Sequence, residues 1–207
     1  MRRVGILGGT FDPVHFGHLS VANQVAQGLE MPVRLLLSAR PPHRDTGAAA
    51  EIRWELLCAA VEGRPELVPD RTELDRDGPS YMFDTLGQLR EAHAGASLCL
   101  ILGADATAGL GAWYRADRLH ERTHLVLVQR PGHKLDAGPL AALGFSAAAT
   151  ADELTGDGGR YYEFPSTRIG ISASAIRRAC RAGRAIDFLT PAPVVQLIAQ
   201  RDLYRSH

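Results

Sequence analysis

A short apolar segment ending in two glycines opens the chain and restricts its fold more than any other feature. Residues 4–7 are typical of a buried parallel strand, and we expect that strand to break at Gly8 and Gly9. Residues 10–18 then lead into a helix whose apolar positions fall on one face between residues 22 and 29. This order presents backbone N–H groups and the positive end of the helix dipole at the turn. Because glycine has no Cβ, an anion such as a phosphate can approach the backbone closely there.

Two histidines accompany this turn. His18 lies four residues before Ala22, so we expect its ring to point inward at the start of the helix. His15 lies three residues earlier, and both rings can converge on an anion at the turn. A lone histidine is more often structural, either capping a loop or half-buried in the core. The pairing of two histidines beside a glycine turn favours the binding role.

Residues 8–18 carry a family resemblance. Their sequence, Gly-Gly-Thr-Phe-Asp-Pro-Val-His-Phe-Gly-His, resembles the G-[GS]-[TS]-F-D-P-x-H-x-G-H signature of the nucleotidylyltransferase superfamily, and more narrowly of bacterial nicotinate-mononucleotide adenylyltransferases. The resemblance implies transfer of an adenylyl group from ATP to nicotinate mononucleotide, giving nicotinate adenine dinucleotide and pyrophosphate in NAD biosynthesis. It also implies that His15 and His18 are catalytic and that the ATP phosphates are bound by Gly8, Gly9, Thr10 and Phe11.

The composition is ordinary for a soluble globular protein. The chain has 207 residues, 45% of them hydrophobic and 22% charged, and its formal net charge is zero, which argues against a nucleic-acid partner. The three cysteines lie in apolar stretches and are expected in the core rather than in a disulfide or a metal cluster. No apolar signal segment follows Leu7 and no stretch has the length of a membrane span. We therefore expect a cytoplasmic location and no membrane contact.

Alternating apolar strands and helices predict a Rossmann-like, doubly wound parallel sheet with helices on both faces. A single domain over residues 1–207, with a small helical element at its C-terminal end, accounts for the length. The expected strands are 33–38, 67–74 (as one strand or two), 97–102, 124–129 and 161–164. The expected helices are 48–63, 82–93, 136–145, a helix capped by Ser172 or Ser174 that runs to about residue 183, and 194–204. We expect a surface loop over 147–160 and interpret the last helix as a packing element only.

The loop of residues 39–45 leaves the edge of the sheet at which ligands bind. In the family that the chain resembles, this loop carries a lysine that reaches the substrate phosphate. Arg44 stands there in this chain, which keeps the charge but changes its reach and geometry. A solvated basic loop is an equally open interpretation.

Residues 76–86 resemble the family segment R-x-G-P-S-Y-T-x-D-T-L, whose helix start receives the nicotinate carboxylate. The resemblance implies this role for Tyr81 and for Met82, which replaces the usual threonine, and it implies that Trp113 lies against the pyridine ring. Two alternatives stay open: Ser80 as a simple helix cap, and Trp113 as a core residue.

The resemblance assigns further residues to ATP. Gly103 and Asp105 follow the most apolar strand, and a carboxylate there can accept two hydrogen bonds from a ribose. A helix cap is the alternative for Asp105. Arg130, in an Arg-Pro-Gly turn, is implied to lie near the adenine.

Residues 169–178 indicate a second phosphate site. We expect Arg177 and Arg178 in the first turn of the helix that Ser172 or Ser174 caps, where cations oppose the helix dipole and a bound polyanion would reverse that penalty. The resemblance implies that Ser172, Ser174 and Arg177 hold the triphosphate, with Arg177 as a catalytic residue. Arg178 also reads as an ordinary exposed helix residue.

Mg²⁺ is expected as an ion that bridges the phosphates, ligated mostly by ATP, because the sequence shows no carboxylate cluster that would form a metal site. ATP and nicotinate mononucleotide are the expected partners, and the sequence leaves a homo-oligomer open. Alternatives are an adenylyltransferase acting on nicotinamide mononucleotide or phosphopantetheine, a cytidylyltransferase, and a non-catalytic ATP sensor. A fragment of a class I aminoacyl-tRNA synthetase is disfavoured, because the sequence shows no evident tRNA-binding domain. An NAD-dependent dehydrogenase is disfavoured, because the first turn lacks G-x-G-x-x-G spacing.

Overall fold

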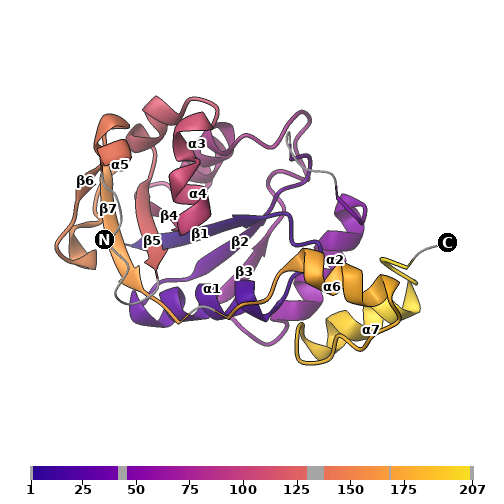
Figure 1. Ribbon diagram of the computed structural model, residues 1–207. Helices are drawn as coiled ribbons and strands as arrows, with labels where there is room; N and C mark the ends of the chain where they lie inside the picture. Colours follow the sequence, from indigo (N-terminus) through magenta and orange to yellow (C-terminus); the bar gives the residue numbers. More distant parts are fainter. Residues whose placement is uncertain (1, 42–45, 130–137, 168, 206–207) are drawn as a thin grey trace.

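A seven-stranded parallel sheet forms the centre of the molecule (Figure 1). The computed structural model describes residues 2–41, 46–129, 138–167 and 169–205. Within these ranges the strand order is β3-β2-β1-β4-β5-β7-β6. The strands are β1 (Arg3–Gly9), β2 (Val33–Leu37), β3 (Leu67–Asp70), β4 (Ser97–Gly103), β5 (His124–Gln129), β6 (Ser146–Ala147) and β7 (Arg160–Pro165).

Helices cover both faces of the sheet, as expected for the doubly wound class (Figure 1). They are α1 (Phe16–Gly28), α2 (Ala50–Val61), α3 (Met82–Ala92), α4 (Ala104–Ala108), α5 (Gly138–Ala142), α6 (Ala173–Arg181) and α7 (Ala192–Gln200), with 3₁₀ turns η1 (Leu110–Ala112), η2 (Ala116–Glu121) and η3 (Ala151–Glu153). Helices α6 and α7 form the expected C-terminal helical element. None of the helices in the described ranges is long and apolar enough to span a bilayer.

Alternate residues of the central strands feed two separate apolar clusters. Leu35 of β2 and Ile101 of β4 pack with α1, α2, α6 and α7, whereas Leu36 and Leu100 pack with α3 on the other face. This burial on both faces is why the strands read as continuous apolar runs rather than alternating ones.

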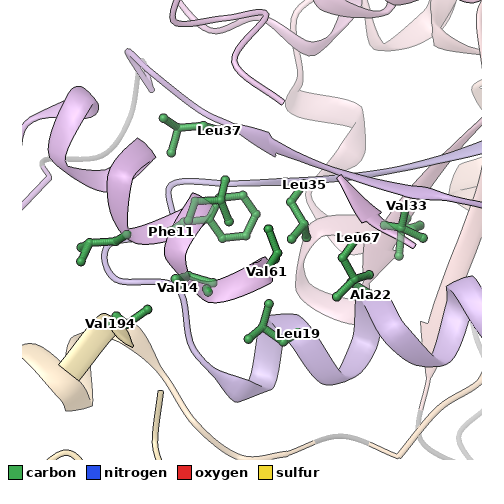
Figure 2. Close-up of a cluster of buried hydrophobic side chains, with 14 of the residues drawn as sticks. Phe11, Val14, Leu19, Ala22, Val33, Leu35, Leu37, Val61, Leu67 and Val194 are labelled. Carbon is green, nitrogen blue, oxygen red and sulfur yellow. The ribbon is translucent and has the colours of Figure 1, made fainter. Parts of the chain in front are cut away.

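The loop between β1 and α1 is anchored in the first of these clusters. Phe11 and Val14 are fully buried, and Figure 2 shows both among the side chains of the cluster, together with Leu35 and with Val194 of α7. Phe11 has a φ of 47°, a backbone conformation that a bulky residue adopts only when its surroundings hold it there.

Several element boundaries differ from the sequence prediction. β1 does not break at Gly8 and Gly9 but continues through both, because they pair with Leu36 and Leu37 of β2. β3 ends at Asp70, whose carboxylate accepts hydrogen bonds from the backbone N–H and hydroxyl of Thr72 and turns the chain, so no strand continues toward residue 74.

The region expected to be a surface loop, residues 147–160, is more ordered than predicted. Its first residue belongs to β6, which pairs with β7, and η3 follows with a capping box between Thr150 and Glu153. Leu154 is fully buried. The loop was predicted because the region is rich in alanine and glycine, a composition that does not indicate these contacts. The preceding helix α5 ends at Ala142, three residues earlier than predicted, and is followed by Gly144 at φ 82°.

A buried arginine ties together the segments that approach the carboxyl ends of β1 and β2. Arg53 of α2 is 1% exposed, and its guanidinium donates hydrogen bonds to four backbone carbonyls, those of Thr10, Ser38, Ala39 and Ala48. The loop after β1 is thereby fixed to the end of β2 and to the start of α2.

We expect Arg53→Met to destabilise the protein by at least about 3 kcal/mol, because each buried carbonyl left without a donor costs about 1–3 kcal/mol. Urea denaturation measures the change. Arg71→Met is the matched control: Arg71 is half-exposed and pairs with Asp75, so its loss should cost less than about 1 kcal/mol. Equal losses in the two variants would contradict the role given to Arg53.

Candidate functional site

Two cavities meet at the carboxyl ends of the central strands. The first, about 460 Å³, lies on the α3 side of the sheet, and the second, about 660 Å³, is lined by the starts of α1 and α6. Leu7, Thr10 and Gly103 line both cavities. These residues lie at the ends of β1 and β4, the neighbouring strands between which the strand order reverses. Open α/β sheets bind their ligands at this position.

The predicted histidine pair lies in the second cavity. The rings of His15 and His18 stack with centroids 3.7 Å apart and planes 22° from parallel. The Phe11 ring packs edge-on against His18 at 5.0 Å. Gly17 makes this arrangement feasible, because a Cβ there would lie 2.9 Å from His15 Nδ1. His15 occupies the N-cap position of α1 without a side-chain capping bond, so the structural role of a cap does not explain it.

Burial keeps both imidazoles neutral. Burial lowers the pKa of His15 from 6.5 to about 4. It lowers the pKa of His18 to about 3, with a smaller contribution from the neighbouring His15. The Nδ1 atom of each ring is buried and, within the described part of the chain, has no hydrogen-bond partner. The cavity therefore presents two uncharged rings at neutral pH.

The start of α6 forms the opposite wall of the second cavity. Ser172 is the N-cap, and its hydroxyl accepts a hydrogen bond from the Ala175 N–H. Ser172, Ser174 and Arg177 line the same cavity as the two histidines, as predicted. The positive end of the α6 dipole and the exposed hydroxyls make this wall suitable for an anion.

One argument from the sequence about α6 is wrong. Because Ser172 rather than Ser174 caps the helix, Arg177 falls in the second turn and Arg178 in the last turn. Arg178 therefore complements the dipole at the C-terminal end and needs no anion to explain it. Arg177 faces the cavity because of its contacts with Asp12: its Nη1 donates to the Asp12 carbonyl at 2.6 Å and lies 3.4 Å from Asp12 Oδ2.

The first cavity contains three of the four residues predicted to contact the acceptor. Tyr81, Met82 and Trp113 line it, and the ring of Tyr81 stacks on Tyr114 at 4.6 Å. Tyr81 is the N-cap of α3, so the unpaired N–H groups of the first helical turn lie at this cavity. Ser80 is not the cap; its hydroxyl instead accepts from the Arg40 N–H and holds the loop after β2.

Of the residues predicted at the ATP phosphates, Gly8 and Gly9 line the first cavity and not the second, Thr10 lines both, and Phe11 belongs to the core. Gly103 and Asp105 line the second cavity, where Asp105 is exposed in the first turn of α4 and Gly103 is the N-cap. The alternative of Asp105 as a helix cap is therefore wrong. Arg44 and Arg130 lie outside the described residues, and their roles stay predictions.

Four residues at the site were missed by the sequence analysis. Asp12 is 2% exposed beside the histidines, and Tyr204, expected only to pack, donates its hydroxyl to Asp12. Glu73 is 3% exposed and lines the first cavity; one of its oxygens accepts from the Thr85 hydroxyl, and Oε2 has no partner in the described part of the chain. Tyr114 completes the aromatic wall. The Phe-Asp-Pro motif signalled Asp12, but the other three depend on contacts between segments distant in sequence.

Within the described ranges, no group of three or more His, Cys, Asp or Glu side chains is arranged to hold a metal ion. Both carboxylate oxygens of Asp12 already accept hydrogen bonds, from Tyr204 and from the Gly47 N–H.

Comparison with known proteins gives consistent matches along the chain. The model of the cytidylyltransferase-like family matches residues 6–179. A Pseudomonas putida (strain W619) protein named "probable nicotinate-nucleotide adenylyltransferase" is 42% identical over 214 residues, covering 100% of this chain and 96% of the relative. A protein of the same name from Halorhodospira halophila is 40% identical, with coverage of 99% and 96%.

Solved structures share the fold. Nicotinic acid mononucleotide adenylyltransferase of Plasmodium falciparum, solved in complex with NaAD, superposes with a TM-score of 0.75 at 16% identity and covers 99% of this chain and 98% of its own. The same enzyme in complex with APC gives a TM-score of 0.72. At this identity the likeness confirms the Rossmann-like architecture.

The buried histidines make stability depend on pH. Between about pH 6.5 and 4 the unfolded chain binds protons that His15 and His18 in the folded chain do not, so stability falls as the pH falls through this range. Each histidine contributes a slope of about 1.4 kcal/mol per pH unit.

We therefore expect His18→Asn to flatten the decline in unfolding free energy between pH 6.5 and 4 by about one histidine's share. Urea denaturation of both proteins at several pH values measures it. Every other titrating side chain is present in both proteins, so the difference reports on His18 together with its contact with His15. Parallel curves would contradict a buried neutral ring at this position.

Proposed function

Because the chain belongs to the nicotinate-nucleotide adenylyltransferase family, we propose that it transfers the adenylyl group of ATP to nicotinate mononucleotide, releasing pyrophosphate in NAD biosynthesis. The observation that carries this proposal is the meeting of the two cavities at Thr10 and Gly103. One cavity has an aromatic wall and a helix N-terminus, which suit a pyridine ring with a carboxylate. The other has imidazoles, hydroxyls and a guanidinium, which suit a triphosphate.

The chemistry is a direct displacement at phosphorus. An oxygen of the mononucleotide phosphate attacks the α-phosphorus of ATP and forms the new P–O bond, while the bond to the β-phosphate oxygen breaks and its electrons leave with pyrophosphate. No side chain has to act as the nucleophile, because the acceptor phosphate is one already. The protein contributes alignment of the two substrates and stabilisation of the charge on the oxygens.

The residues of the second cavity divide this work. In our proposal His15, His18 and the Thr10 hydroxyl contact the α-phosphate at the junction of the cavities, supported by the backbone of residues 8–11. Ser172, Ser174 and Arg177 hold the β- and γ-phosphates at the positive end of α6. Gly103 and Asp105 receive the ribose of ATP, where the exposed carboxylate can accept from both hydroxyls.

The first cavity would receive the acceptor. The pyridine ring of nicotinate mononucleotide would lie against Trp113. The carboxylate on that ring would accept hydrogen bonds from the first N–H groups of α3, beside Tyr81 and Met82. A backbone contact of this kind does not depend on the threonine that Met82 replaces. Arg44 toward the mononucleotide phosphate and Arg130 toward the adenine complete the proposal.

A divalent cation, most simply Mg²⁺, would enter with ATP and offset the charge of its phosphates. The donors in the described ranges suit an ion held mainly by phosphate oxygens and water, because Asp105 is an isolated exposed carboxylate and the Asp12 oxygens are occupied. A single domain, a cytoplasmic location and a homo-oligomeric state stay predictions from the sequence.

Pyrophosphate release tests the reaction. With ATP and Mg²⁺ we expect product from nicotinate mononucleotide, and none from phosphopantetheine or with CTP in place of ATP. Turnover of nicotinamide mononucleotide at an equal kcat/KM would overturn the preference for the acid. ATP binding without pyrophosphate from any acceptor would identify a sensor rather than an enzyme.

His18→Ala should lower kcat about 100- to 1,000-fold, the usual cost of losing one well-placed donor in a transition state. The matched control is His93→Ala at the C-terminal end of α3, remote from both cavities, which should leave kcat unchanged. Circular dichroism establishes that both variants are folded. A His18→Ala enzyme with near-normal kinetics would remove the proposed role of this residue.

A further inference from the structure

The carboxylate of Asp12 is a meeting point for segments far apart in the sequence. Tyr204 Oη donates to Oδ1 at 2.8 Å, and the Gly47 N–H donates to Oδ2 at 2.5 Å. Arg177 Nη1 lies 3.4 Å from Oδ2 and donates to the Asp12 carbonyl at 2.6 Å. The loop after β1, the loop after β2, α6 and the C-terminal segment are thus joined at one residue that is 2% exposed.

This junction fixes the direction of the Arg177 guanidinium. Nη1 donates to the Asp12 carbonyl, while Nη2 donates a longer hydrogen bond, 3.4 Å, to Ser174 Oγ at the second cavity. One edge of the planar group is therefore held by Asp12, and the other lies beside Ser174 where the group lines the cavity. A guanidinium with one edge fixed loses less conformational freedom when it binds a phosphate than a mobile one does.

Tyr204 is the donor to Oδ1 of Asp12, while Gly47 and Arg177 lie at Oδ2. The Tyr204 hydroxyl is the partner of Oδ1, and burial is the main cause that raises the pKa of Tyr204, so the group remains a donor at neutral pH. The ring packs separately in the cluster beneath α7, with its edge against Gly47. Removing only the hydroxyl leaves this packing intact but leaves a buried carboxylate oxygen without a donor.

We propose that Tyr204 is a positioning residue for the phosphate site: through Asp12 it orients Arg177, so that the C-terminal end of the chain sets the affinity for the polyphosphate of ATP. This inference rests on the proposed function for the identity of the nucleotide, but the link from Tyr204 to Arg177 can be measured with inorganic tripolyphosphate alone. The proposal concerns the donor cavity, and the acceptor cavity should not sense the change.

The first test compares wild type, Tyr204→Phe and the matched control Tyr161→Phe, a buried tyrosine of β7 in the other apolar cluster. Calorimetry should give a Kd for tripolyphosphate that is about tenfold higher in Tyr204→Phe and unchanged in the control, the loss expected for one hydrogen bond to a charged acceptor. In steady-state assays the KM for ATP should rise about tenfold, with the KM for nicotinate mononucleotide unchanged. An unchanged tripolyphosphate Kd would overturn the proposal, and so would equal changes in the KM for ATP and the KM for nicotinate mononucleotide.

A double-mutant cycle separates positioning from general loosening of the fold. If Tyr204 acts through Arg177, Tyr204→Phe should add little to the weakened tripolyphosphate binding of Arg177→Lys, so the combined loss should be close to that of Arg177→Lys alone. Losses that multiply would overturn the link. Asp12→Asn reaches the same junction from its other side, and it should reproduce the selective effect if Tyr204→Phe folds poorly.

The outcomes for this inference and for the proposed function are distinct. A wild-type chain that binds tripolyphosphate but transfers no adenylyl group would end the proposed function, while the Tyr204→Phe comparison would still decide the positioning role. A Tyr204→Phe variant with the tripolyphosphate Kd and kinetic constants of the wild type would rule out the positioning role and leave the proposed function in place.

Discussion

The buried anchoring of residues 10–12 is the constraint on which the rest of the site depends. Arg53 holds the Thr10 carbonyl, Phe11 is buried at a positive φ, and Asp12 is held by donors from three other segments. A loop that follows a strand is ordinarily exposed and mobile. This loop is held by buried contacts at three successive residues, 10–12. The Thr10 hydroxyl and the two histidines that follow are therefore attached to a rigid segment.

The anchoring has an electrostatic consequence for the histidines. Packing His15 against His18 and burying their Nδ1 atoms keeps the rings neutral, which costs stability in acid but leaves the empty cavity without a strong positive charge of its own on that side. A polyphosphate bound against the rings would favour their protonated forms. The two histidines can therefore gain positive charge when the nucleotide binds. Arg177 and the α6 dipole attract the phosphates before that.

The sequence predicted the parts of the molecule in which one residue pattern has one physical solution. Apolar runs separated by helical patterns predicted the sheet, the spacing of His15 and His18 predicted that the two rings converge, and the family resemblance predicted that Ser172 and Arg177 join them at one cavity. What it could not predict depends on contacts between distant segments. Gly8 and Gly9 look like a strand break until β2 is placed beside them, and Tyr204 looks like a packing residue until its hydroxyl is placed at Asp12. The helical turn in which Arg177 lies depends on whether Ser172 or Ser174 caps α6, and the sequence left both serines open.

The arrangement of the two cavities follows from the topology of the sheet rather than from any single side chain. β1 and β4 are adjacent, and the chain leaves their ends toward opposite faces, so the loop after β1 and the start of α4 separate the two cavities while Leu7, Thr10 and Gly103 remain common to both. Two anionic substrates, one in each cavity, would meet at these shared residues. The zero net charge of this chain is consistent with a design in which helix ends and a few oriented donors, rather than a large basic surface, bring the two phosphates together.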